Sequence, residues 1–139
     1  KVRKMIELRK KNNIVKEQVA SPYRSWKPRV LTKRELGDFG EKVVAEFLEK
    51  QGYVIEEKNY KSRAGEIDII AKTKDEIVFF EVKTRTTDDF GSPAEAVDQK
   101  KQKRIRNAAA TYMICQKITN YDVAFDVIEI NISHIENAF

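Results

Sequence analysis

The chain has 139 residues and a net charge of +5, and 35% of its residues are charged. One cysteine and one histidine exclude an internal disulfide and a metal site built from those residues, so a bound metal would need oxygen ligands. No apolar run is long enough to span a bilayer and the first residues lack the apolar stretch of a secretory signal, so we expect a cytoplasmic protein.

The basic charge is concentrated at the start of the chain. Residues 1–34 hold twelve Lys or Arg against two Glu, whereas the remainder is mildly acidic. Such an extension would either dock on a phosphate backbone or remain a solvated tail. We therefore predict a basic N-terminal extension and linker over 1–34, a folded domain over 35–131 and a short tail over 132–139.

Apolar spacing and turn residues predict the elements in chain order. Within the extension, weak helical spacing covers residues 1–20, and two prolines make residues 21–30 an irregular linker. An amphipathic helix over 33–51 follows, because apolar residues recur at helical spacing and Thr32 can cap it. Three strands, a second helix and a last strand complete the pattern, over 53–60, 66–73, 76–84, 94–117 and 123–130.

This order predicts an α/β fold with a mixed central sheet flanked by helices, in the order α-β-β-β-α-β. Residues 74–75 would form the hairpin turn between the second and third strands. Both of these strands are largely apolar on both faces, so we expect them in the middle of the sheet. Cys115 would lie on the buried stripe of the second helix, and His134 would be exposed in the tail.

Charged side chains interrupt this apolar hairpin. Side chains alternate across a strand, so Glu66 and Asp68 should share one face, as should Glu81 and Lys83. Pairing of the two strands would crowd three carboxylates and one ammonium group. A divalent metal would relieve that crowding, and a metal beside a lysine suits phosphodiester cleavage. The alternative is a set of cross-strand carboxylate–lysine pairs that only solvates the hairpin.

A series of motifs follows in one order along the chain: Gly40-Glu41, Gly52-Tyr53, Asn59, Gly65-Glu66-Ile67-Asp68-Ile69-Ile70, Phe79-Phe80-Glu81-Val82-Lys83-Thr84-Arg85, Phe90-Gly91, Val97, Lys101 and Phe125-Asp126-Val127. In these motifs the chain resembles the YraN-like (UPF0102) family of bacterial proteins, over Leu36 to Ile130. So many landmarks in the same order make a chance match unexpected.

The resemblance implies a restriction-endonuclease-like core with the PD-(D/E)xK signature of that nuclease superfamily. It implies that Asp68 and Glu81 bind a Mg²⁺ or Mn²⁺ ion and that Lys83 is the catalytic lysine. Glu41 would be the additional acidic residue of the site, as a catalytic residue and metal ligand. Glu66 belongs to the family motif without a defined role.

Two departures from the family pattern stand out. Ala124 replaces the arginine that usually precedes Phe-Asp in the last strand, so an ion pair made by that arginine would be missing. The basic extension also lies outside the pattern.

We therefore expect a metal-dependent deoxyribonuclease that selects DNA structure rather than sequence. The cations expected to bind nucleic acid are Lys61, Arg63, Arg85, Lys101 and Arg104. The alternatives are a nucleic-acid-binding module that keeps the fold without cleaving, and a metal-stabilised scaffold that binds a partner. A homodimer would suit a fold whose relatives cut two strands, and no membrane partner is expected.

Overall fold

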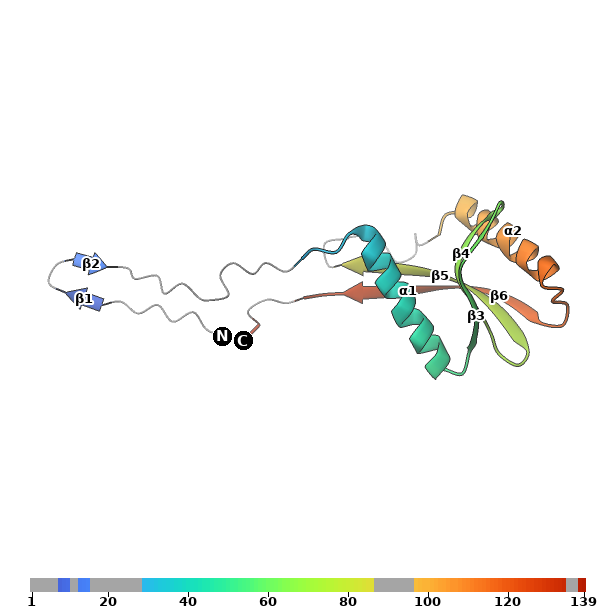
Figure 1. The fold of residues 1–139 in the computed structure, drawn as a ribbon, viewed down its shortest axis with the longest axis horizontal. Helices are drawn as coiled ribbons and strands as arrows, with labels where there is room; N and C mark the ends of the chain where they lie inside the picture. Colours follow the sequence, from blue (N-terminus) through green and yellow to red (C-terminus); the bar gives the residue numbers. More distant parts are fainter. Residues whose placement is uncertain (1–7, 11–12, 16–28, 87–96, 135–137) are drawn as a thin grey trace. The chain divides into compact units, whose positions relative to one another are not determined.

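In a computed structural model, the structure describes residues 8–10, 13–15, 29–86, 97–134 and 138–139 (Figure 1). Contacts divide the chain into two units, Lys1–Val30 with Ile135–Phe139, and Leu31–His134.

In the first unit, strands β1 (Leu8–Lys10) and β2 (Asn13–Val15) pair antiparallel. The expectation of a loose helix over residues 1–20 is therefore wrong for these six residues. Ile14 and Val15 are β-branched, which favours extended backbone over helix. Residues 16–28, which hold most of the predicted linker, lie outside the described ranges.

The second unit contains one four-stranded sheet and two helices (Figure 1). The sheet order is β3-β4-β5-β6. Strand β4 pairs antiparallel with both β3 and β5, and β6 pairs parallel with β5. The elements are α1 (Lys33–Lys50), β3 (Val54–Ser62), β4 (Gly65–Lys72), β5 (Glu76–Thr86), α2 (Gln99–Cys115) and β6 (Asp122–Ile132). The predicted α/β fold, its element order and its mixed sheet with a central β4–β5 hairpin are confirmed.

The helices cover opposite faces of the sheet. Residues of α1 pack with one set of β4 and β5 side chains, which we call the α1-side core: Val44, Ala45, Leu48, Ile69, Ala71, Val78 and Phe80. Residues of α2 pack with the other set, the α2-side core: Ile67, Ile70, Ile77, Phe79, Ile105, Ala108, Ala109 and Tyr112. The middle strands are buried on both faces, so their nearly continuous apolar sequence is explained.

Both helices begin at side-chain caps. Thr32 accepts from the Glu35 backbone N–H at 3.2 Å, and the Glu35 carboxylate accepts from the Thr32 N–H at 2.9 Å. This reciprocal pair is a capping box. Asp98 accepts from the Lys101 N–H at 2.7 Å and caps α2. The prediction that this helix already includes Val97 and Asp98 is therefore wrong, and residues 94–96 lie outside the described ranges.

The chain reverses more tightly than expected between β3 and β4. Ser62 pairs with Gly65, which leaves only Arg63 and Ala64 in the turn, whereas the sequence predicted a five-residue loop. Lys61 therefore belongs to β3. The predicted turn at residues 74–75 is confirmed, with the Thr73 N–H donating to the Glu76 carbonyl at 2.8 Å.

Several apolar helix residues are more exposed than the apolar pattern predicts. Cys115 is exposed at the last position of α2, so its predicted burial is wrong. On α1, Phe39 and Phe47 are about half exposed, because the helix turns Val44 and Leu48 to the sheet instead. His134 is exposed, as predicted. Within the described ranges, neither helix is both long and apolar enough to cross a membrane.

Candidate functional site

The candidate site lies where the ladder between β4 and β5 stops. Backbone pairing runs from Lys72 opposite Ile77 to Ile69 opposite Phe80. At the next position, the Val82 N–H donates to Oδ2 of Asp68 at 2.7 Å. The Asp68 carboxylate thus replaces a backbone acceptor, and a charge-assisted hydrogen bond of this kind fixes its position.

Strand alternation is interrupted at the same place. Ile67 packs in the α2-side core, whereas Ile69 packs in the α1-side core. Residues two apart in a regular strand would share one face. Asn59, across from this point on β3, has a φ of 55°, which asparagine tolerates better than most residues. Glu66 and Asp68 were expected to share a face because side chains alternate in a regular strand. Side chains do not alternate regularly at this point of β4.

Glu66 lies in solvent at the start of β4. Its carboxylate is 3.7 Å from Nζ of Lys61, and both side chains are about 70% exposed. An exposed pair of this kind contributes little to stability. The structure thus places Glu66 with a surface lysine, and its role in the site remains a prediction.

Glu81 is a buried carboxylate, with only 5% of the residue exposed. Alternation is regular in β5, so Glu81 and Lys83 follow Ile77 and Phe79 on the α2 face, as predicted. Nζ of Lys101, on α2, forms an ion pair with Oε1 of Glu81. Burial raises the pKa of Glu81 and the Asp68 charge adds to that rise, whereas Lys101 and Lys83 oppose it.

Glu41 reaches the site from α1. Nδ2 of Asn59 donates to its Oε2 at 2.8 Å. Burial raises the pKa of Glu41, with further contributions from the negative charges of Asp68, Asp38 and Glu81, while the Asn59 hydrogen bond lowers it. The charges of Asp68 and Glu81 thus act on Glu41, although α1, β4 and β5 bring these carboxylates from different elements.

Gly40 allows α1 to approach β5 at this site. A Cβ atom at position 40 would lie 1.7 Å from Oγ1 of Thr84. Any side chain would therefore push the helix away from the strand. The Thr84 hydroxyl is buried and is the one buried side-chain polar atom in the described part of the chain without a hydrogen-bond partner. The Gly40-Glu41 motif thus combines close helix packing with a carboxylate directed at the site.

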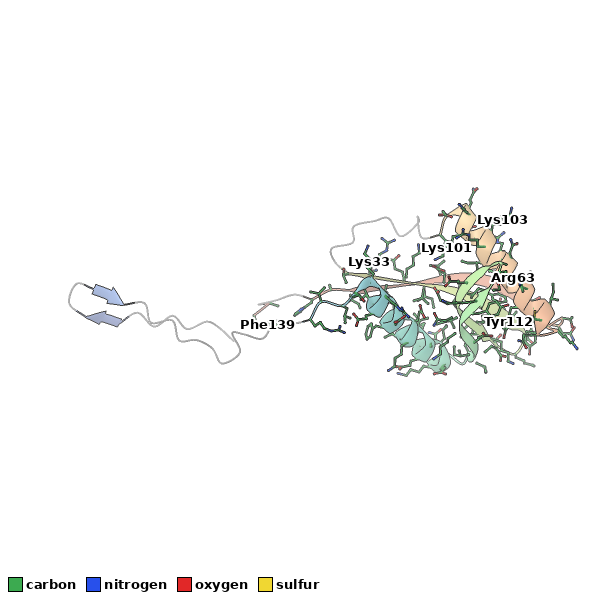
Figure 2. All side chains as sticks on the ribbon, turned by 45° about the horizontal axis from the view of Figure 1, so that its top comes forward. Lys33, Arg63, Lys101, Lys103, Tyr112 and Phe139 are labelled. Atoms are coloured by element: carbon green, nitrogen blue, oxygen red, sulfur yellow. The ribbon has the colours of Figure 1, made fainter. Side chains whose placement is uncertain are left out.

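The predicted nucleic-acid-binding cations fall into three settings. Lys61 lies near the end of β3 and Arg63 lies in the β3–β4 turn. This turn lies against α2, because a Cβ atom at Gly65 would be 2.9 Å from the Arg104 carbonyl oxygen. Arg85 is held by Glu129 of β6, with Nε and Oε2 3.6 Å apart. Lys101 and Arg104 lie in the first turns of α2, where Figure 2 also shows Lys103.

Sequence reasoning missed two contacts within the site. It assigned Lys101 to substrate binding and did not foresee its ion pair with Glu81, and it gave Asn59 no partner. Both residues are among the landmarks that the chain shares with the family, so the sequence marked them without showing their partners. Only the packing of α2 and α1 on the sheet shows which carboxylates they contact.

The site offers oxygen donors, which suit Mg²⁺ or Mn²⁺. Glu41, Asp68 and Glu81 contribute carboxylates from α1, β4 and β5. In the conformation observed, no three acidic, histidine or cysteine side chains among the described residues are gathered as a metal-binding cluster. The Lys101 ammonium group instead neutralises Glu81.

Comparisons with a family profile and with individual proteins identify the same family. The profile of the uncharacterised protein family UPF0102 matches residues 40–130. A UPF0102 protein of Clostridioides difficile is 48% identical over 114 residues, covering 78% of this chain and all of the relative. Another, from Caldanaerobacter subterraneus, is 44% identical over 119 residues, covering 78% of this chain and 98% of the relative. A third, from Clostridium perfringens, is 53% identical over 106 residues, covering 76% and 85%. The chain therefore belongs to the UPF0102 family.

Proposed function

We propose that this protein is a metal-dependent nuclease that hydrolyses phosphodiester bonds in DNA. One observation carries the proposal: the buried Glu81 carboxylate lies where β4 and β5 separate, electrostatically coupled to Asp68 and Lys83. Burial of a carboxylate is costly, and the Lys101 ion pair offsets only part of that cost, because the pKa of Glu81 is still raised. The coincidence of two acids and a lysine at an interrupted ladder supports catalysis over surface solvation.

The carboxylates suit a divalent metal. Burial and mutual repulsion raise the pKa values of Glu41 and Glu81, so a bound cation would relieve an existing electrostatic cost. A metal held by Asp68 and Glu81, with Glu41 completing the set, would polarise the phosphodiester and lower the pKa of a bound water. The Val82 N–H fixes Asp68, and the Asn59 amide fixes Glu41, so two of the three donors are already oriented.

Lysines complete the proposed chemistry. Lys83 follows Glu81 on the same strand face and would stabilise the negative charge that develops on the phosphate oxygens. Lys101 pairs with the Glu81 carboxylate, and we assign it a positioning role. Its side chain is half exposed and would also be available to a phosphate of the substrate.

Cleavage assays test the nuclease proposal. The native chain, with Mg²⁺ or Mn²⁺, is incubated with linear duplex, single-stranded, flapped and branched DNA. Asp68→Asn and Lys83→Met should each reduce the rate by about 100-fold or more, as expected for the loss of a group that acts in the transition state. Asp75→Asn and Lys74→Met are matched controls, because both residues are exposed in the turn at the other end of the hairpin. Activity that survives both site substitutions would come from a contaminant.

Calorimetry gives a second readout that does not depend on turnover. Titration of Mn²⁺ into the native chain should show binding, which Glu81→Gln should weaken by about 10-fold or more. Lys101→Met should leave Glu81 without its internal cation and tighten metal binding. Equal binding by the native chain and by Glu81→Gln would contradict the proposed ligand set.

The second candidate is a non-catalytic nucleic-acid-binding module. The ion pair between Lys101 and Glu81 favours it, because a carboxylate neutralised within the fold has less need of a metal. This function predicts salt-dependent DNA binding with no cleavage under any metal condition. Binding that persists unchanged in Asp68→Asn, without product from the native chain, would select it.

A further inference from the structure

A groove of about 240 Å³ adjoins the candidate site. Its lining combines the apolar side chains of Phe79, Phe125 and Val127 with the charged side chains of Arg106, Asp126 and Glu81. Glu81 therefore belongs to both the groove and the site. A pocket with an apolar floor and a few polar groups at its rim suits a flat, partly polar ligand.

Phe125 is the central feature of this groove. It lies on β6 and is 41% exposed, although its ring stacks on the buried Phe79 with centroids 5.5 Å apart and planes inclined by 24°. The Arg106 guanidinium carbon lies 5.7 Å from the Phe125 ring centroid. Two stacked rings and a neighbouring guanidinium group thus offer surfaces on which a planar aromatic ligand could stack.

We propose that this groove binds one unpaired nucleobase of the substrate. This inference rests on the nuclease function, which places the scissile phosphate at Glu81. Nucleobases stack on aromatic rings and on guanidinium planes, and this stacking is tolerant of base identity. A base within a duplex is already stacked between its neighbours. The groove therefore selects DNA with a single-stranded segment at the cleavage point, such as a flap, a gap or a junction.

Charge also favours a nucleotide as the occupant. The first turns of α2 carry a group of exposed cations suited to phosphates: Lys100, Lys103, Arg104 and Arg106. Asp126, at the groove, can accept hydrogen bonds from the amino groups on the edge of a base. An acidic peptide would meet Asp126 and Glu81 instead. The cations of α2 thus suit a phosphate backbone along the helix, and the groove suits a base.

Equilibrium binding without turnover tests the inference. The full chain is titrated, in EDTA, against two fluorescent flapped duplexes that differ only in having bases or abasic sites at the flap junction. The native chain should bind the flap with bases roughly 5-fold or more tightly, because stacking of a base contributes a factor of this size. Phe125→Leu keeps an apolar side chain without the ring, and Arg106→Lys keeps the charge without the plane. Both variants should lose the preference.

Val123→Ala is the matched control. Val123 lies two residues before Phe125 on β6, is similarly exposed at 48%, and does not line the groove. This variant should keep the preference for the flap with bases. Thermal unfolding of each variant would show whether a lost preference instead reflects a lost fold.

The outcomes separate this inference from the nuclease proposal. Cleavage by a native chain that binds both flaps equally would overturn the groove inference and leave the nuclease proposal standing. A preference for the flap with bases, without cleavage in the presence of any metal, would overturn the nuclease proposal and leave base binding by the groove standing. A native dimer that becomes monomeric in Phe125→Leu, measured by light scattering, would overturn the inference and assign the exposed face of β6 to contacts between copies.

Discussion

Near its turn, the β4–β5 hairpin is paired and apolar on both faces, whereas at its open end the pairing stops and charges gather. Ile69 to Lys72 pair with Ile77 to Phe80, and both helices bury this half. At the other half, the Asp68 carboxylate replaces a backbone acceptor and Glu81 is buried as an acid. The closed half is regularly paired and buried on both faces, whereas in the open half the Asp68 carboxylate interrupts the pairing and Glu81 is buried with Lys101 as its partner.

The largest expected effect lies in the closed half. Phe80 is 3% exposed, and its ring meets Tyr53 edge-to-face with centroids 5.7 Å apart. Phe80→Ala should lower the free energy of unfolding by about 3–5 kcal/mol, because a cavity replaces a buried ring. Urea denaturation measures this loss. A cost similar to that of the exposed-turn variant Lys74→Met would mean that this half is not the stabilising part.

The next effect concerns the approach of α1 to the open half. Gly40→Ala should destabilise the protein by about 1–3 kcal/mol, because the new methyl group would overlap the Thr84 hydroxyl. Gly37→Ala is the matched control on the same helix, since no atom lies within 4 Å of its added Cβ. That variant should gain up to about 1 kcal/mol from helix propensity.

A double variant sharpens this test. Adding Thr84→Ala to Gly40→Ala removes the atom that the methyl group meets, along with a buried hydroxyl that has no partner. Much of the lost stability should return. Equal costs in the single and double variants would show that the clash is not the cause.

Glu81 gives a pH-dependent effect. Its pKa is raised above the ordinary value of 4.5, chiefly by burial, so the folded state binds this proton more tightly than the unfolded chain does. Its contribution to stability is therefore complete below the ordinary value and is lost as pH rises through the raised one. Glu81→Gln cannot ionise, so its stability relative to the native chain should increase over this window.

Urea denaturation at a series of pH values, in EDTA, measures that difference. Lys101 is half exposed in its side chain and can be solvated when its partner is removed. Glu66→Gln provides the reference for the loss of a solvent-exposed carboxylate. A Glu81→Gln curve that runs parallel to that of the native chain would contradict the electrostatic cost assigned to Glu81.

The smallest effect is expected at Glu66 itself. Glu66→Gln removes only an exposed pair with Lys61, so the free energy of unfolding should change by less than about 0.5 kcal/mol. Cleavage should also be retained, in contrast to Asp68→Asn two residues later on the same strand. A loss of cleavage equal to that of Asp68→Asn would place Glu66 in the catalytic group.

Local patterns in the sequence determined the elements and the middle of the sheet. The apolar period, the Thr32 cap and the turn at residues 74–75 each act within a few residues, so they can be read directly from the chain. The placement of Glu81 and Lys83 on one face could be predicted in the same way, because side chains alternate regularly along β5. The predicted start of α2 was wrong, because the helix begins only after the Asp98 cap.

Only the tertiary structure decided which distant side chains complete the site. Lys101 meets Glu81 across 20 residues and Asn59 meets Glu41 across 18, and these contacts depend on how each helix lies on the sheet. The interruption of alternation at Asp68 also depends on its neighbours, because a strand period assumes a regular ladder. A one-dimensional pattern specifies local geometry, whereas the depth of a helix on a sheet is set by the packing of residues such as Gly40 and Thr84.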